Sequence, residues 1–90
     1  MSLNVNGSQP SLPLSMIAAG EKACLVEIRG GQSLHKRLSD MGLTIGAVVR
    51  VVQGDPAGPM ILAIKNDARL ALGRGVAQQI IVSVVTVVAD

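Results

Sequence analysis

The chain has 90 residues, of which 49% are apolar and 16% are charged, with eight Lys or Arg against six Asp or Glu. This length suits one domain, and the apolar content excludes a disordered or highly charged chain. Phe, Tyr and Trp are absent. Proteins usually bind single-stranded nucleic acid by stacking its bases on aromatic rings, so this absence argues against such binding. The basic residues are scattered, and only Lys36 and Arg37 are adjacent, so we expect no nucleic-acid partner.

Residues 1–12 are rich in Ser, Asn, Gly and Pro, and we expect them to form a disordered lead to a folded domain at 13–90. This lead lacks the basic and apolar regions of a secretory signal. The longest apolar stretch, 80–89, is far shorter than the ~20 residues that cross a bilayer as a helix. The single cysteine, Cys24, suits a reducing compartment. We therefore expect a cytoplasmic protein without direct membrane insertion.

A first strand is predicted at residues 23–29, where apolar side chains alternate. We expect Cys24, Val26 and Ile28 to face inward. This orientation would make Cys24 a small core residue and not a nucleophile. The glycines at 30 and 31 end the strand.

The helical pattern of the chain follows these glycines. Leu34, Leu38 and Met41 recur at a helical spacing and predict one apolar face that packs on the domain. Ser33 is placed to cap the first turn with its hydroxyl group. Gly42 is placed to end the helix, because glycine readily adopts the left-handed conformation found there.

The other side of this helix carries His35, Lys36 and Arg37. A metal site needs three or four ligands, so we expect no cofactor and regard His35 only as a weak or adventitious ligand for iron or zinc. Cys24 is predicted on the inward face of a strand and His35 on the outer face of the helix, so the two side chains do not meet as a nucleophile and its base. The acidic residues do not cluster either. The sequence therefore predicts no enzyme.

The second half of the chain predicts four more strands, at 47–53, 60–65, 68–72 and 80–88. A Gly- and Pro-rich loop at 54–59 and a tight turn at 66–67 connect the first three. A single helical turn is predicted at 76–79, before a last strand that is apolar on both sides. Five short strands and one short helix predict a mostly-β fold, a small and partly closed barrel.

Residues 30–46 contain short motifs in a defined order, namely Arg37-Leu38, Met41-Gly42 and Gly46. In this order and spacing the segment resembles the signature of the FeoA family. The resemblance covers about residues 13–85, and the chain departs from the family at Asn66-Asp67, in place of a turn glycine, and at Val76, in place of an acidic residue. Further matching positions are Pro56, Gly58 and Pro59, segment 70–77, Ile80 and Val82.

The resemblance implies an SH3-like β-barrel and a small cytoplasmic accessory protein of ferrous iron uptake. Such a protein would bind and modulate a FeoB-type membrane transporter that has a GTPase domain. The same domain also occurs at the C-terminus of metal-dependent repressors. A metal-responsive regulatory module is therefore the alternative.

Four residues are candidates for contact with a protein partner. They are Lys36 and Arg37 on the outer helix face, Arg74 between two glycines, and Met60 in an apolar hairpin. The apolar last strand is also compatible with self-association into a homo-oligomer. Five signature residues have structural roles, in helix packing or in turns: Leu34, Leu38, Met41, Gly42 and Gly46.

Overall fold

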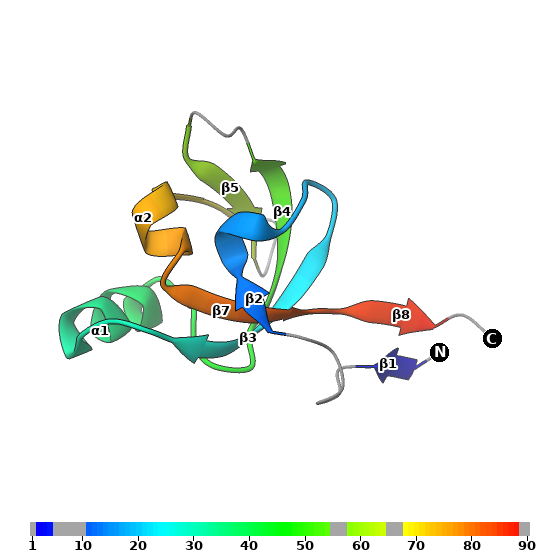
Figure 1. The fold of residues 1–90 in the computed structure, drawn as a ribbon, viewed down its shortest axis with the longest axis horizontal. Helices are drawn as coiled ribbons and strands as arrows, with labels where there is room; N and C mark the ends of the chain where they lie inside the picture. The colour runs from blue at the N-terminus through cyan, green and yellow to red at the C-terminus, as the bar shows by residue number, and fades with distance from the viewer. Residues whose placement is uncertain (1, 5–10, 55–57, 65–67, 89–90) are drawn as a thin grey trace.

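The computed structural model describes residues 2–4, 11–54, 58–64 and 68–88 (Figure 1). Its main element is a six-stranded antiparallel sheet with the strand order β2-β7-β3-β4-β5-β6. The sheet curls on itself (Figure 1), in keeping with the predicted partly closed barrel. Its strands are β2 (Leu12–Pro13), β3 (Lys22–Ile28), β4 (Val48–Gly54), β5 (Met60–Ala63), β6 (Arg69–Leu72) and β7 (Ile80–Val84).

Three short helical segments connect these strands. The 3-10 helix η1 (Leu14–Met16) follows β2, α1 (Gln32–Asp40) joins β3 to β4, and α2 (Arg74–Ala77) joins β6 to β7. The helical turn predicted at 76–79 begins two residues earlier, because Gly73 is extended and acts as the N-cap of α2.

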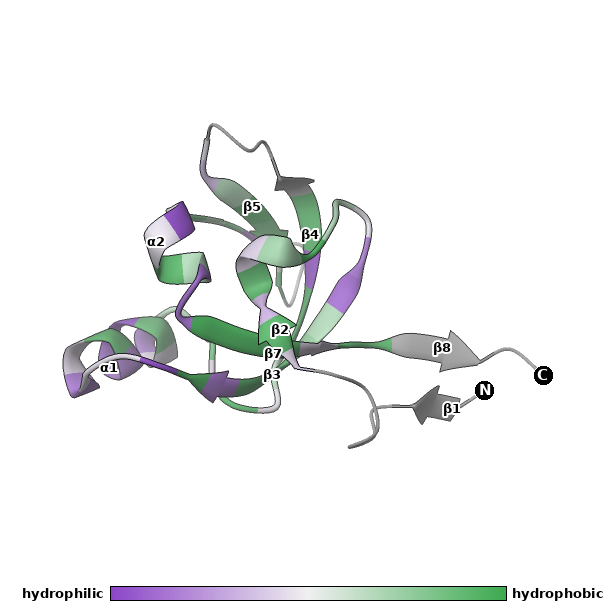
Figure 2. Ribbon diagram, in the orientation of Figure 1, coloured by the Kyte–Doolittle hydropathy of each residue, from purple (hydrophilic) through white to green (hydrophobic). Residues whose placement is uncertain are grey.

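The core is entirely aliphatic apart from methionine, in keeping with the composition, and Figure 2 shows its hydrophobic residues along β4, β5 and β7. Strand β7 lies between β2 and β3, and its residues 80–83 are all buried. This arrangement confirms the prediction of a last strand covered on both faces. The largest fully buried side chains are Leu14, Leu25, Leu38, Leu43, Met60, Leu62, Ile80, Val49, Val51 and Val82.

Strand β3 differs from the predicted orientation. Ala23, Leu25 and Ile28 are its buried residues, whereas Cys24 is half-buried and Val26 is 38% exposed. The inward assignment of Cys24 and Val26 is therefore wrong, and that of Ile28 is confirmed. The cause is a β-bulge after Leu25 in the pairing with β7, which turns Ile28 to the same side as Leu25.

Helix α1 begins differently from the prediction but carries the predicted apolar face. Its N-cap is Gly31, no side chain caps the first turn, and Ser33 lies within the helix. The predicted cap at Ser33 is therefore wrong. Leu38 is fully buried and Leu34 packs beside it on the core.

The end of α1 is set by Gly42, whose φ of +89° confirms the predicted left-handed conformation. The Gly42 N–H donates to the Ser39 carbonyl at 3.0 Å, and the Leu43 N–H donates to the Leu38 carbonyl at 2.8 Å. These two bonds form a Schellman motif, in which Leu43 and Leu38 also share the core. Gly46 has a φ of +91° in the turn before β4, as predicted.

The N-terminal lead is partly ordered. Strand β1 (Ser2–Asn4) pairs antiparallel with β8 (Thr86–Val88), and Leu12 pairs with Val82 of β7. The prediction of disorder is therefore wrong for residues 2–4 and 12, because the C-terminal strands supply partners for their backbone groups. The predicted last strand divides at Val85 into β7 and β8. Residues 5–10, the loop centre at 55–57 and the turn at 66–67 lie outside the described residues.

We expect Gly42→Ala to lower the free energy of unfolding by about 1 kcal/mol, because an added Cβ is strained at a positive φ. A Cβ at Gly42 meets no atom within 4 Å, so the loss of stability comes from backbone strain and not from a steric clash. Thermal unfolding measures it as a fall in Tm of about 4–8 °C.

The matched control is Gly75→Ala, within α2, where an added Cβ also meets no atom within 4 Å and no positive φ occurs. This variant should be stabilised by up to ~1 kcal/mol, because alanine loses less backbone entropy on folding. An equal loss of stability in both variants would contradict the role given to Gly42.

Candidate functional site

A small groove lies between α1 and the corner where β6 leads into α2. Its volume is about 160 Å³, and its lining combines one cationic residue with apolar and small residues. The walls come from α1 on one side and from the end of β6 and α2 on the other. The lining residues are Leu34, Arg37, Leu38, Met41, Ala71, Leu72, Gly73 and Val76.

Helical geometry explains why Arg37 lies at this groove. Residues three or four apart on a helix are neighbours, so Arg37 lies beside Leu34 and Met41 on one side of α1. Leu38 is fully buried beneath them, whereas Leu34 and Met41 are only half-buried. The predicted structural residues of the signature therefore also form the apolar part of this groove.

Lys36 and Arg37 are both exposed, as predicted for the outer side of α1. Only Arg37 lines the groove. Arg37 also lies in the last turn of α1, where a cation interacts favourably with the helix dipole. Arg37 is therefore the stronger candidate for contact with a partner, because its charge adjoins an apolar recess and that of Lys36 does not.

His35 contacts the end of the preceding strand. Its Nε2 lies 2.8 Å from the Ile28 carbonyl oxygen and donates to it, which selects the tautomer with a proton on Nε2. This bond connects α1 to the end of β3. Within the described ranges, no three His, Cys, Asp or Glu side chains form a group that could hold a metal ion.

Arg74 has a different role from the predicted partner contact. Its side chain is half-buried, with Nε donating to the Gly58 carbonyl at 3.2 Å and Nη1 donating to the Ser15 carbonyl at 3.0 Å. The guanidinium group therefore connects α2 to η1 and to the loop before β5. Arg74 is engaged within the fold.

Met60 is not available to a partner. It is fully buried, and it pairs with Leu72 of β6 and Gly54 of β4. The prediction that Met60 forms a contact surface is wrong, because the hairpin turns Met60, Leu62 and the half-buried Ile64 to the inner side of the sheet.

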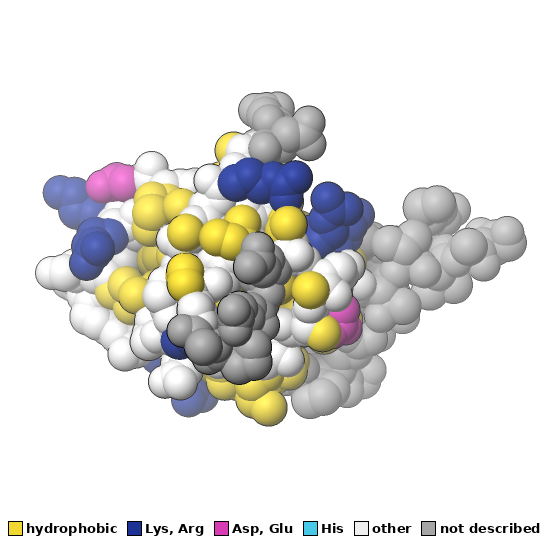
Figure 3. All heavy atoms as spheres, turned by 90° about the horizontal axis from the view of Figure 1, so that it is seen from above, with side chains coloured by type: hydrophobic (Ala, Val, Ile, Leu, Met, Phe, Trp, Pro, Cys, Tyr) yellow, Lys and Arg dark blue, Asp and Glu magenta, His cyan; other side chains and the backbone are white. Residues whose placement is uncertain are grey.

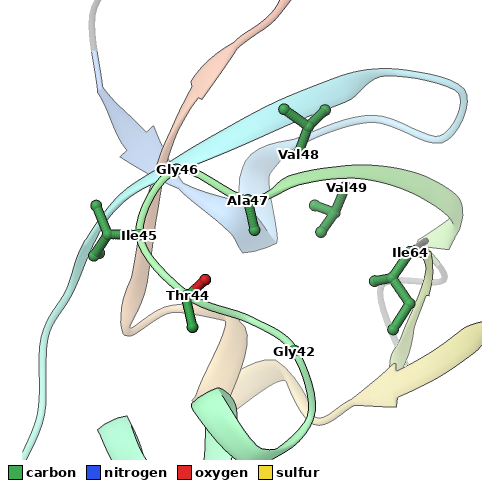
Figure 4. Close-up of a pocket in the computed structure, with 8 residues that line it drawn as sticks. All are labelled: Gly42, Thr44, Ile45, Gly46, Ala47, Val48, Val49 and Ile64. Carbon is green, nitrogen blue, oxygen red and sulfur yellow. The ribbon is translucent and has the colours of Figure 1, made fainter.

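A second, larger pocket lies where the α1–β4 connection passes the end of β5 (Figure 4). Its volume is about 650 Å³. Val49 and Ile64 point into it, while Ile45 and Val48 stand at its rim and are 59% and 42% exposed. Sequence reasoning missed this pocket, although the apolar residues on both sides of the 47–53 strand were a signal for it.

The described residues thus form a small aliphatic β-barrel with two apolar recesses, one of them bordered by Arg37. Among these residues, no helix is both long and apolar enough to cross a membrane.

Comparisons with known proteins place the chain in a family. The FeoA domain model matches residues 12–84. The chain belongs to the FeoA family, which is linked to ferrous iron uptake. A comparison with curated proteins gives no match.

Solved structures agree with this assignment. The crystal structure of an iron uptake regulatory protein (FeoA) is 36% identical, with a TM-score of 0.77 over 83% of this chain and 99% of that chain. The FeoA protein of Chlorobium tepidum is 28% identical, with a TM-score of 0.72 over 81% and 70%. These likenesses confirm the predicted SH3-like barrel.

The fold is also found in a larger regulator. A manganese-dependent transcriptional repressor is 23% identical, with a TM-score of 0.76 over 83% of this chain and 37% of that chain. At this identity the likeness shows the fold alone.

We expect Arg74→Met to lower the free energy of unfolding by about 2 kcal/mol, because hydrogen bonds from a charged group to the Gly58 and Ser15 carbonyls are lost. Chemical denaturation measures this change. Arg69→Met is the control, since Arg69 is exposed on β6, and its effect should stay within about 0.5 kcal/mol. Equal effects of the two substitutions would show that the Arg74 bonds do not stabilise the barrel.

Proposed function

We propose that this protein is a cytoplasmic accessory of ferrous iron uptake that binds and modulates the cytosolic part of a FeoB-type transporter. The observation that carries the proposal is the groove beside α1, where Arg37 adjoins an apolar recess. Membership of the FeoA family supports the link to iron uptake.

The groove has the two properties that protein interfaces combine. Half-buried Leu34 and Met41 offer apolar surface, and the recess of about 160 Å³ is large enough to admit an apolar side chain of a partner. Arg37 at its edge carries a planar group with several donors, which suits carboxylates and backbone carbonyls. Lys36 adds a second positive charge next to it.

The modulation acts through binding, since the partner has its own GTPase domain. The accessory protein contributes a rigid surface: α1 is connected to β3 by the His35 bond and ends in the Schellman motif at Gly42. A preformed surface loses little entropy when a partner binds.

The alternative, a metal-responsive regulatory module, stays a prediction from the resemblance. The likeness to the manganese-dependent repressor concerns the fold, and this chain spans 37% of that protein. We therefore propose the transporter as the partner.

We expect Arg37→Glu to weaken binding to the cytosolic part of a FeoB-type transporter of the same organism by at least about tenfold, or ~1.4 kcal/mol. The cause is a reversed charge at the edge of the apolar recess. Isothermal titration calorimetry measures the affinity, and the Tm of the variant checks that it folds.

The matched control is Arg29→Glu, which makes the same change in charge at an exposed site outside the groove. This variant should bind like the parent protein. Equal binding by the parent, Arg37→Glu and Arg29→Glu would remove the groove from the interface, and no binding by the parent would overturn the proposed function.

A further inference from the structure

The outer face of the sheet carries a row of positive charges. The strand register places Lys22 of β3 opposite Arg50 of β4, Arg50 opposite Ala63 of β5, and Ala63 opposite Arg69 of β6. Lys22, Arg50 and Arg69 are all exposed. With strands about 4.8 Å apart, the row extends over about 14 Å.

This row is unfavourable for the isolated protein. Like charges directly opposite on neighbouring strands are destabilising, and Lys22 and Arg50 have that relation. Within the part of the chain that the structure describes, none of these three cations has a carboxylate partner. Glu27, near the other end of β3, forms an ion pair with Arg29, just after the strand, with 3.6 Å between Glu27 Oε2 and Arg29 Nε.

Apolar surface continues from the row along the same face. Val48 pairs with Cys24 and lies two residues from Arg50, so its exposed side chain shares the outer side with both. Val48 and the exposed Ile45 also line the 650 Å³ pocket, which reaches inward from this end of β4 to Val49 and Ile64. Figure 3 shows the molecule from above, where hydrophobic side chains and separate Lys and Arg side chains share one face.

We infer that this face binds an acidic polypeptide segment that places a bulky apolar side chain in the pocket beside Ile45 and Val48. Charge complementarity selects the occupant, because carboxylates would neutralise the row formed by Lys22, Arg50 and Arg69. The apolar pocket next to the row selects a polypeptide over a nucleic acid, since the surface is aliphatic and offers no ring for stacking. The α1 groove is a separate surface, because none of these three cations lines it.

The test selects binders from a random peptide library about ten residues long, enough to cross the row and the pocket at ~3.3 Å per residue. The full chain is the target, and the double variant Lys22→Glu/Arg50→Glu is the counter-target. We expect the enriched peptides to combine Asp or Glu with a bulky apolar residue. Fluorescence anisotropy then measures the affinity of the best peptide.

The single variant Arg50→Glu should weaken that peptide at least tenfold while its Tm stays equal to the parent's or rises. The rise is expected because glutamate opposite Lys22 replaces a repulsive pair by an attractive one. Arg29→Glu, with the same change in charge, should leave the affinity unchanged. Replacing the apolar residue of the peptide by alanine should also weaken binding at least tenfold.

Several results would overturn the inference: no enrichment, enriched peptides without acidic residues, or equal binding to Arg50→Glu. Equal affinity for an oligothymidylate of similar length would identify a general polyanion site instead. Concentration-dependent dimers that disappear in Arg50→Glu would identify a second copy of the chain as the occupant. In each of these cases the acidic segment is not the ligand of this face.

Discussion

The barrel depends on how its two end strands are held together, because β2 and β6 do not pair with each other in the six-stranded sheet. Arg74 joins the two ends. From α2, just after β6, it donates to a carbonyl of η1, just after β2, and to a second carbonyl in the loop before β5. These bonds also fix α2 and its residue Val76, which forms one wall of the groove beside α1. The same Arg74 hydrogen bonds therefore hold the barrel closed and keep the α2 wall of the candidate site in place.

Local signals in the sequence predict most of the secondary structure, and contacts between distant segments account for the errors. Helical spacing and the glycine at position 42 place α1 and its end correctly, because both depend on neighbouring residues. The face of β3 could not be predicted, since the bulge after Leu25 exists only in the pairing with β7. The hydrogen bonds of Arg74 could not be predicted either, because its partners Gly58 and Ser15 lie 16 and 59 residues away in the chain.

Only the α1 side of the candidate site could be predicted, because its other side is formed by a segment distant in the sequence. Exposure of Lys36 and Arg37 follows from the helical pattern, but the recess beside Arg37 requires the β6–α2 corner on its other side. The cationic row requires the register of four strands, which no local pattern in the sequence contains. The two surfaces use different chemistry, one a single arginine at an apolar recess and the other a line of charges beside a pocket.

The position of β7 between β2 and β3 in the sheet has a consequence for how the protein folds. Residue 12 pairs with residue 82 and residue 23 with residue 84, so β2 and β3 both pair with a strand that is synthesised about 60 to 70 residues after them. During synthesis, β3 to β6 can form a meander, but the barrel cannot close before β7 leaves the ribosome. Such long-range pairing places folding in the millisecond-to-second range that is typical of small barrels. A chain interrupted before residue 80 would lack β7, which would leave β2 without its partner strand and would expose the backbone edge of β3 to association with other chains.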